Sequence, residues 1–392
     1  MTSLPDVHGS TAPGFEPVRH AFAANFGREE PNREAGAALC VYVRGRCVVD
    51  LWGGVAAPGR AWEADTLVNV WSVTKGVVAA AVAMLVDRGE ADYDAPVARY
   101  WPEFAQAGKG GITLEQMMSH QAGLNGFDAP TSLEDFFDWD LVTGRLAAQA
   151  PAWTPGTLAS YHAMTYGFLA GEVIRRVSGR TPGAFIRDEI SGPLGADIFV
   201  GLPEVLEGRV APVLPPPLEQ ANADANADPR SGVAGRATVN PRVDPAWPNR
   251  RDWRAAEVPA ANGHASARGL GRFYGALAHG GEMDGTRLLS TAGVERMRRT
   301  RHSGPDQMLG PRHWGAGVAS HVTANFGPDP ETFGHTGWGG AFGCANAGRE
   351  AGVGYVMSRM GTQITGNPRG GSLCDALFAS LPNARPATRR TA

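Results

Sequence analysis

The stretch NVWSVTKGVVAAAVAML, residues 69–85, joins an apolar helical pattern to a serine and a lysine near its start. Lys75 is one of only two lysines in the chain, and the other is Lys109. The apolar spacing predicts a helix over residues 73–88, ended by the glycine that follows it. Ser72 would then stand at the helix start, on the same face as Lys75.

A serine and a lysine at this spacing can act as a nucleophile and its base. A serine hydroxyl is a poor nucleophile until a base removes its proton, and a lysine can be that base when burial lowers its pKa. The helix N-terminus also directs backbone N–H groups toward Ser72, which can stabilise an oxyanion. The alternative is a helix-capping serine beside a lysine that extends to solvent. The pair alone does not decide between them.

Composition and charge describe an ordinary globular chain. Of 392 residues, 43% are hydrophobic and 19% charged, with a net charge of -3. This balance supplies neither a basic field for nucleic acid nor a polybasic patch for a membrane surface. The first residues lack the pattern of a signal peptide, and no apolar run is long enough to span a bilayer. We therefore expect a cytoplasmic protein without nucleic-acid or membrane partners, and the oligomeric state stays open.

The four cysteines show no CxxC spacing. Residues 37–54 read as two strands around an Arg-Gly turn, in a register that pairs Cys40 with Val49 and Cys47 with Tyr42. Such a register makes a disulfide between the two cysteines unexpected, and free thiols suit a reducing compartment.

The order of predicted elements is strands, helices, strands and a last helix. A short helix is expected to begin at the cap Thr113, and further helices at residues 160–179, 266–281 and 372–380. Strands are expected at 314–322, 332–337, 341–348 and 352–360. Residues 203–259 are rich in Pro, Ala, Asn and Asp and predict a long surface loop or flap. We expect an α+β protein whose α/β domain combines residues 1–88 and 262–392, with a mostly helical domain at 89–261 inserted between them.

Four motifs in order carry a resemblance to a known family. They are SVTK at 72–75, SHQAGL at 119–124, PGTLASYHAMTYGFLAGEVIRRVSGR at 155–180 and FGHTGWGGAFG at 333–343. Together they resemble serine hydrolases related to class C β-lactamases and penicillin-binding proteins, and most of all the family VIII carboxylesterases. The resemblance covers roughly residues 37–360. It implies a β-lactamase/D,D-peptidase-like fold, with an antiparallel sheet flanked by helices and a mostly helical domain.

The resemblance also implies roles for single residues. Ser72 would be the nucleophile, Lys75 its base, and Tyr161 a second base that later protonates the leaving group. A tyrosine needs a neighbouring ammonium to lower its pKa, and we expect Lys75 to do this, so that the two titrate as a pair. The alternatives are that Tyr161 is a buried helical aromatic, or that Tyr166 is the matching tyrosine.

The last motif predicts a substrate-binding strand at the edge of the site. By the resemblance, His335, Thr336, Gly337 and Trp338 bind substrate, and the backbone amides of Ser72 and Trp338 form the oxyanion hole. Without the resemblance, the same residues would be a glycine-rich hairpin with no ligand.

Two departures from the family pattern bear on the substrate. Penicillin-recognising relatives usually carry Lys-Thr-Gly and Tyr-x-Asn, whereas this chain has His335 and Ala163 at those lysine and asparagine positions. A histidine that is mostly neutral at pH 7 binds a carboxylate more weakly than a lysine does. The apolar bulk of Trp338 acts in the same direction. These changes favour a neutral, fairly apolar ester.

Rival chemistries find little support in the sequence. His120 is the obvious competing base, and we interpret it as a structural residue of its loop. There is no HExxH metal motif, no G-x-S-x-G elbow and no nucleotide fingerprint, so no metal or cofactor is expected. The predicted function is a serine esterase that forms an acyl-serine intermediate on a small-molecule ester. The alternatives are a β-lactamase, D-aminopeptidase, amide hydrolase or acyltransferase on the same scaffold, and, outside this class, an inactive binding module.

Overall fold

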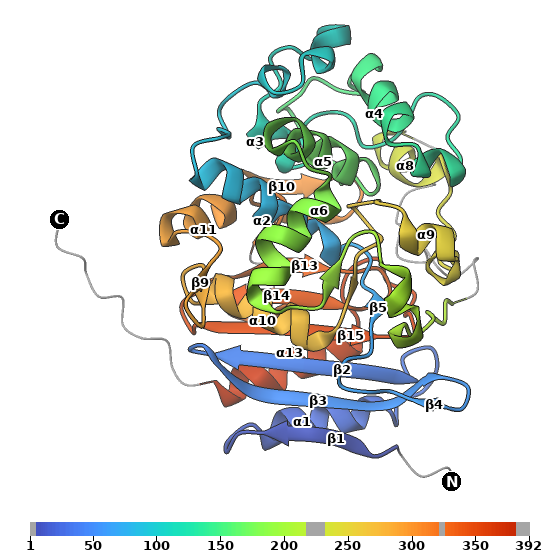
Figure 1. Ribbon diagram of the computed structural model, residues 1–392, viewed down its shortest axis with the longest axis vertical. Coiled ribbons are helices and arrows are strands. Elements are labelled where there is room, and N and C mark those ends of the chain that lie inside the picture. Colours follow the sequence, from blue (N-terminus) through green and yellow to red (C-terminus); the bar gives the residue numbers. More distant parts are fainter. Residues whose placement is uncertain (1–4, 217–231, 321–325, 382–392) are drawn as a thin grey trace, which may run out of the picture.

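The computed structural model describes residues 5–216, 232–320 and 326–381. Within these residues ten strands form one antiparallel sheet, in the order β1-β3-β2-β15-β14-β13-β12-β11-β10, with β4 paired to β3. Their bounds are β1 Val7–Thr11, β2 Gly36–Val43, β3 Arg46–Ala57, β4 Arg60–Ala61, β10 His302–Asp306, β11 Gly310–Trp314, β12 Ala319–Ser320, β13 Thr332–Thr336, β14 Phe342–Asn346 and β15 Ala351–Met357. Figure 1 shows the blue strands of the N-terminal region beside the red strands of the C-terminal region, so both ends of the chain build the sheet. The predicted α+β class is confirmed.

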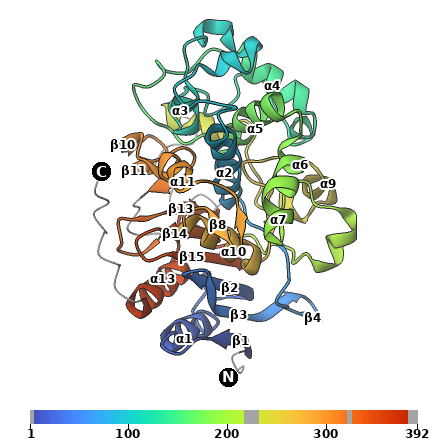
Figure 2. The same ribbon diagram turned by 60° about the vertical axis from the view of Figure 1, so that its left-hand side comes forward.

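The helices lie on both faces of the sheet and in a separate layer above it (Figures 1 and 2). Their bounds are α1 Glu16–Asn25, α2 Val73–Asp87, α3 Leu114–Met118, α4 Trp139–Ala148, α5 Thr165–Ser178, α6 Pro182–Ile186, α7 Gly192–Leu194, α8 Gly232–Val239, α9 Arg251–Ala255, α10 Ala267–Ala278, α11 Thr291–Arg298 and α13 Pro368–Ser380. Short 3-10 turns η2 (Pro102–Gly108) and η3 (Glu134–Phe137) join helices of the upper layer. Three two-stranded pairings complete the described structure: β5 (Val68–Asn69) and β6 (Ile198–Phe199) each pair with β7 (His264–Ala265), and β8 (Glu282–Met283) pairs with β9 (Thr286–Arg287).

Neighbouring residues of β14 show how the two faces are covered. A Cβ added at Gly343 would meet the Tyr274 ring of α10. The side chain of the preceding residue, Phe342, lies instead against Gly370 of α13. Side chains alternate between the faces of a strand, so α10 and α13 cover opposite faces of the sheet. The helix α1 packs against α13, and Figure 2 shows these two together on one side and α10 on the other.

The helix α2 is the central element of the molecule. It lies between the sheet and the upper helical layer, in contact with α5, α11 and β13. The predicted start, end and terminal glycine are confirmed, because the helix spans Val73–Asp87 and Gly89 has a φ of 76°. The helix is buried on every side, since all residues from 73 to 86 are buried. A helix that is apolar all round belongs in a protein interior.

The β2–β3 hairpin forms as predicted, but its register shifts at one point. A bulge between Val41 and Tyr42 leaves Tyr42 opposite Cys47 and moves Cys40 from the expected Val49 to Asp50. The bulge brings the sulfur atoms of Cys40 and Cys47 to 3.9 Å, and both thiols are free. The pattern of alternating residues carries no signal for such an extra residue.

Other expectations need correction. The helix predicted over residues 160–179 begins only at Thr165, so residues 160–164 form an irregular segment before it. The predicted loop at 203–259 contains α8 and α9, and Trp253 of α9 is completely buried. Of the strand expected at 314–322, Trp314 ends β11 and Ala319–Ser320 form β12, with an irregular turn between them, and 321–322 lie outside the described residues. The elements β1, α1 and the β10–β11 hairpin were not anticipated.

The proposed division into domains at 1–88 with 262–392 and at 89–261 stays a prediction. Among the described residues, no helix has the length and apolar character required to cross a membrane.

Candidate active site

Ser72 stands at the start of α2 without acting as its cap. Its backbone is helical, with φ -69° and ψ -6°, and its side chain makes no capping hydrogen bond. By contrast, Ser266 and Ser290 begin α10 and α11 in extended backbone, and each accepts a hydrogen bond from the backbone three residues on. The capping alternative is therefore excluded for Ser72. The preceding residue, Trp71, has a φ of 47°, a sparsely populated conformation that often accompanies functional sites.

Lys75 is 0% exposed and lies one helical turn from Ser72. Its Nζ is 3.0 Å from the Ser72 hydroxyl oxygen, 2.7 Å from the carbonyl oxygen of Ala163 and 2.8 Å from that of Ala260. A lysine extending to solvent is thus ruled out. Burial lowers the pKa of Lys75 well below its ordinary value, because the apolar surroundings disfavour the charged form.

The two carbonyl oxygens reach Lys75 because of how α5 packs. A Cβ at Gly167 would lie 2.2 Å from the backbone nitrogen of Ala260, so only glycine lets the first turn of α5 touch this segment. Ala163 belongs to the irregular residues just before α5, and its carbonyl oxygen faces Lys75. Two segments far apart in sequence therefore converge on one amine.

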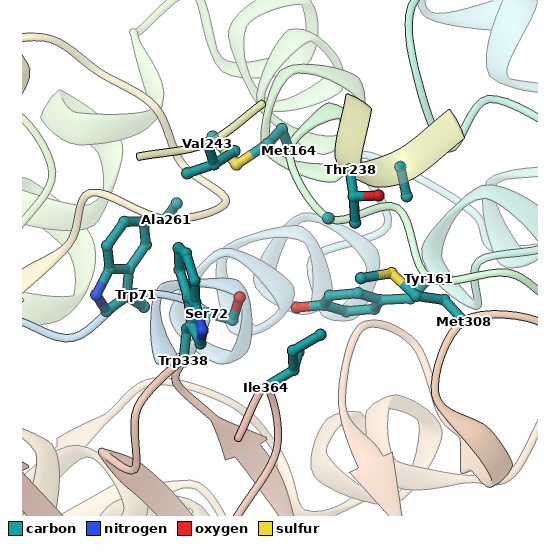
Figure 3. A pocket seen from close by; sticks show the side chains of 12 residues that line it. Trp71, Ser72, Tyr161, Met164, Thr238, Val243, Ala261, Met308, Trp338 and Ile364 are labelled. Carbon is teal, nitrogen blue, oxygen red and sulfur yellow. The ribbon is translucent and has the colours of Figure 1, made fainter. Parts of the chain in front are cut away.

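Tyr161 lies in the same irregular segment, and its hydroxyl points toward Ser72 (Figure 3). The side chain is 3% exposed and forms a hydrogen bond with the side chain of Ser72. The Lys75 Nζ sits 4.8 Å from the centre of its ring. Tyr166, the alternative, instead directs its hydroxyl to the sulfur of Met118 at 3.8 Å. The structure thus brings Tyr161, and not Tyr166, to the Ser72–Lys75 pair.

The expected lowering of the Tyr161 pKa is wrong in direction. Burial raises the pKa of Tyr161, the hydrogen bond with Ser72 opposes this, and the charge of Asp306 adds to it. Tyr161 is therefore a protonated hydroxyl group at neutral pH, and a hydrogen-bond donor.

The His335-Thr336-Gly337 triplet forms the end of β13 and the turn after it, directly beside the nucleophile. A Cβ at Gly337 would lie 2.3 Å from the Val70 carbonyl oxygen, two residues before Ser72. The His335 Nδ1 donates to the Thr336 carbonyl oxygen at 2.7 Å. Burial, aided by the charge of Lys75, lowers the pKa of His335 to about 3, so this ring is neutral at pH 7.

Beside Ser72, two tryptophans form an aromatic wall. The rings of Trp71 and Trp338 meet edge to face with centroids 5.0 Å apart, and Trp71 also contacts Trp253 of α9 at 6.0 Å. Figure 3 shows the Trp338 ring next to the Ser72 hydroxyl and the Trp71 ring on the far side of Trp338. Such pairs bury a large apolar area in a fixed geometry.

A cavity opens over these residues, with about 530 Å³ of empty space that includes the part open to solvent. Its lining consists of Trp71, Ser72, Tyr161, Ala163, Met164, Ala237, Thr238, Val243, Ala261, Met308, Trp338 and Ile364. No carboxylate, ammonium or guanidinium group is among these described lining residues. His335, Thr336 and Gly337 are not among them either, and their predicted contact with substrate stays a prediction.

Sequence reasoning missed several parts of this site. The residues at 237, 238 and 243 come from the region read as a loop, and Met308 and Ile364 belong to no recognised motif. The acceptors of Lys75 are backbone carbonyl groups, which any residue supplies, so the sequence carries no signal for them.

His120 is fully buried and has the contacts of a structural residue. Its φ is 64°, and its Nδ1 accepts the backbone N–H of His162 at 3.1 Å. Its ring packs against the rings of Tyr161 and Trp314 at 4.9 and 4.5 Å between centroids. Burial keeps the pKa of His120 well below its ordinary value. Across residues 5–216, 232–320 and 326–381, no three His, Cys, Asp or Glu side chains gather as metal ligands.

Comparison with known proteins identifies the class to which this fold and site belong. The chain belongs to the beta-lactamase family, whose domain matches residues 26–369. The resemblance to family VIII carboxylesterases seen in the motifs is confirmed by the relatives.

Three relatives cover nearly the whole chain. The "Esterase/beta-lactamase LipL" of Mycobacterium tuberculosis is 39% identical over 364 residues, which are 90% of this chain and 82% of the relative. The crystal structure of a family VIII carboxylesterase is 42% identical, covers 96% of this chain and 100% of the other, and superposes with a TM-score of 0.89. A penicillin-binding protein homolog from Caulobacter crescentus is 41% identical with the same coverage and a TM-score of 0.88.

Proposed function

We propose that this protein hydrolyses neutral, fairly apolar carboxylic esters through an acyl-enzyme formed on Ser72. The protein is a carboxylic ester hydrolase on the β-lactamase scaffold, as its relatives named esterases and carboxylesterases support. One observation carries the assignment of the base: the two carbonyl oxygens that approach Lys75 at 2.7 and 2.8 Å.

A neutral amine has two N–H groups and one lone pair. With both N–H groups donated to the carbonyl oxygens of Ala163 and Ala260, the lone pair of Lys75 is left for the third neighbour, the Ser72 hydroxyl at 3.0 Å. The lowered pKa of Lys75 agrees with this neutral state. Lys75 in this state accepts the proton of Ser72 as the hydroxyl oxygen attacks the ester carbonyl.

Tyr161 completes the cycle as the proton donor. Its hydroxyl stays protonated because its pKa is raised, and it lies against Ser72 on the side open to the cavity. As the tetrahedral intermediate collapses, Tyr161 donates its proton to the leaving alcohol and regains one from the ammonium of Lys75. Water then attacks the acyl-enzyme by the same route in reverse.

The oxyanion is assigned to the backbone N–H groups of Ser72 and Trp338. Among the described residues, no hydrogen bond uses the Ser72 N–H, and this group lies at the start of α2 where the helix dipole is positive. The assignment of Trp338 rests on its position directly after the His-Thr-Gly triplet.

The neutrality of the substrate follows from the cavity. Its described lining holds aliphatic, aromatic and thioether groups and the hydroxyls of Ser72, Tyr161 and Thr238, without a cation to pair a carboxylate. An anionic substrate would leave part of its charge unpaired in an apolar site, which is costly. β-Lactam hydrolysis remains the second candidate, because one relative carries both activities in its name.

The nucleophile is tested with Ser72→Ala and with Ser290→Ala as a matched control at another helix start. Ser72→Ala should lose at least about a thousandfold in kcat for p-nitrophenyl butyrate, since no other group forms the acyl-enzyme. Ser290→Ala should lose a capping bond, worth about 1 kcal/mol of stability, and keep its activity. A serine-directed phosphonate should label only Ser72 in the wild type. Labelling of another serine would refute the assignment.

A further inference from the structure

A buried carboxylate lies directly behind Tyr161. Asp306, the last residue of β10, is 2% exposed. Its Oδ1 accepts the backbone N–H of Tyr161 at 3.2 Å, together with those of Met308 at 2.9 Å and Leu309 at 3.0 Å. Its Oδ2 accepts the indole Nε1–H of Trp314 at 3.1 Å. In the described part of the chain no lysine or arginine nitrogen lies within 4 Å, so four N–H groups stabilise this carboxylate.

Asp306 thereby holds Tyr161 at two points. The first is the Tyr161 backbone itself. The second is the ring, because the Trp314 indole that Asp306 holds is stacked on the Tyr161 ring, with centroids 5.8 Å apart and planes 8° from parallel. The Gln307 N–H donates to the Ala159 carbonyl oxygen at 3.0 Å, which joins the end of β10 to the same segment.

Tyr161 needs such restraint because no regular element supplies it. The residue precedes α5 by four positions, in a segment without helical or sheet hydrogen bonds. A displacement of about 1 Å at a reacting group can cost about a hundredfold in rate. Three groups face the Tyr161 ring, those of Lys75, His120 and His335, and among the described residues none makes a hydrogen bond to it. His120 holds the backbone N–H groups on either side of Tyr161, and Asp306 holds that of Tyr161 itself.

We propose that Asp306 is the positioning residue of Tyr161, whose carboxylate fixes the backbone and, through Trp314, the ring plane, so that the hydroxyl faces the leaving alcohol. This inference rests on the proposed ester hydrolysis with Tyr161 as proton donor. The negative charge of Asp306 has a second effect in the same direction, because it disfavours the phenolate and so keeps the Tyr161 proton available for donation.

The test uses two esters of one acid, p-nitrophenyl butyrate and ethyl butyrate, and compares kcat/KM, which reports the step that releases the alcohol. Nitrophenolate leaves without a proton, whereas ethoxide requires one. Tyr161→Phe should therefore lose about a hundredfold or more on ethyl butyrate and far less on the nitrophenyl ester. A variant that only misplaces Tyr161 should also lose more activity on ethyl butyrate than on the nitrophenyl ester, but both losses should be smaller than in Tyr161→Phe.

Asp306→Asn is the decisive variant. Its amide oxygen can still accept the three backbone N–H groups, but its amide nitrogen would face the Trp314 N–H, donor against donor. We expect kcat/KM for ethyl butyrate to fall about tenfold more than kcat/KM for the nitrophenyl ester. Trp314→Phe keeps a stacked ring but removes the indole donor, so it should show the same selectivity, and it carries the test if Asp306→Asn does not fold.

Glu172→Gln is the matched control. Glu172 of α5 is also a buried carboxylate that accepts a tryptophan N–H, from Trp139 at 2.8 Å, and it does not line the cavity. Any loss in this variant should be equal for both esters.

An equal loss on both esters in Asp306→Asn, beside a selective loss in Tyr161→Phe, would overturn the positioning role and leave the proposed function intact. An unselective loss in Tyr161→Phe would overturn both this inference and the assignment of Tyr161 as proton donor. Retained activity in Ser72→Ala would instead refute the proposed function itself.

Discussion

The chain has two lysines, and the structure buries both completely in different ways. The Lys109 Nζ donates to three backbone carbonyl oxygens, those of Gln106, Ala147 and Gln149, and so ties η2 to the end of α4. The Lys75 Nζ meets two carbonyl oxygens and the Ser72 hydroxyl. Neither nitrogen has a carboxylate within 4 Å among the described residues.

The third neighbour separates a structural lysine from a proposed catalytic one. All three neighbours of the Lys109 nitrogen are carbonyl oxygens, which only accept hydrogen bonds, so a neutral amine would turn its lone pair against one of them. The surroundings of Lys109 therefore favour an ammonium. Two carbonyl oxygens and a hydroxyl can be satisfied by a neutral amine, because a hydroxyl also donates. Burial lowers the pKa of both lysines, and that of Lys75 much further. Burial alone therefore does not identify a catalytic base. The two lysines differ in how many of the three neighbours of the nitrogen are groups that can only accept a hydrogen bond.

The largest expected difference between the two lysines is in activity, when each is replaced by methionine. Lys75→Met should lose about a thousandfold or more in kcat for p-nitrophenyl butyrate, as expected when the base that activates a nucleophile is removed. Lys109→Met should keep kcat per folded molecule within about twofold, since Lys109 does not line the cavity.

Stability should follow the opposite order. Lys109→Met leaves the buried carbonyl oxygens of Ala147 and Gln149 without a donor, whereas that of Gln106 keeps the backbone N–H of residue 109. This variant should cost about 2 kcal/mol or more of the free energy of unfolding. Lys75→Met also removes the donor of two carbonyl oxygens, but the amine it removes is neutral and is not required by its surroundings, so its loss of stability should be smaller. Urea unfolding of both variants measures this. A larger loss of stability in Lys75→Met, or a loss of kcat of similar size in both, would contradict the distinction between the two lysines.

The pH dependence sharpens the comparison. If Lys75 must be neutral, kcat/KM should fall about tenfold per pH unit below the lowered pKa of Lys75 and reach a plateau above it. Lys109→Met should leave this acidic limb in place, because Lys109 takes no proton in the reaction. A midpoint at the pKa values of His335 or His162, which burial lowers to about 3 and about 4, would assign the limb to a histidine instead. Circular dichroism at each pH separates titration from unfolding.

The sequence predicted the parts of this site that depend on residue type. The spacing of Ser72 and Lys75, the start and end of α2 and the match of Tyr161 could all be inferred, because each reflects a side chain or a helical period. The difference between Lys75 and Lys109 could not, because it is made by backbone carbonyl groups that long-range packing brings together.

Long-range packing also explains the other features of the structure that the sequence did not predict. The bulge that moves Cys40, the late start of α5 at Thr165 and the burial of Trp253 in α9 are set by tertiary contacts rather than by local pattern. Asp306 lies in an unremarkable turn sequence, and only the fold shows that it faces Tyr161. The class of fold was predictable because alternating strands and apolar helices encode it directly.

The smallest expected effect is a change in substrate preference when His335→Lys places a third lysine beside the site. In the penicillin-recognising proteins that the motifs resemble, a lysine at this position pairs with the substrate carboxylate. In this chain the residue is His335, whose lowered pKa leaves it neutral at pH 7. We expect the ratio of kcat/KM for a chromogenic cephalosporin to that for p-nitrophenyl butyrate to rise about tenfold, the value of one ion-pair hydrogen bond of about 1.5 kcal/mol. The neutral ester should change within about threefold.

Burial limits the size of this gain. The same burial that lowers the pKa of His335 would lower the pKa of a new lysine, so part of its charge would be lost before a carboxylate arrived. His335→Gln, which is neutral at every pH, provides the control and should leave the ratio unchanged. A gain in His335→Gln equal to that in His335→Lys would mean that space rather than charge limits the cephalosporin. A wild type that already prefers the cephalosporin would refute the ester assignment in favour of β-lactam hydrolysis, and the uncharged cavity would then have to bind the carboxylate through hydroxyl and backbone donors alone.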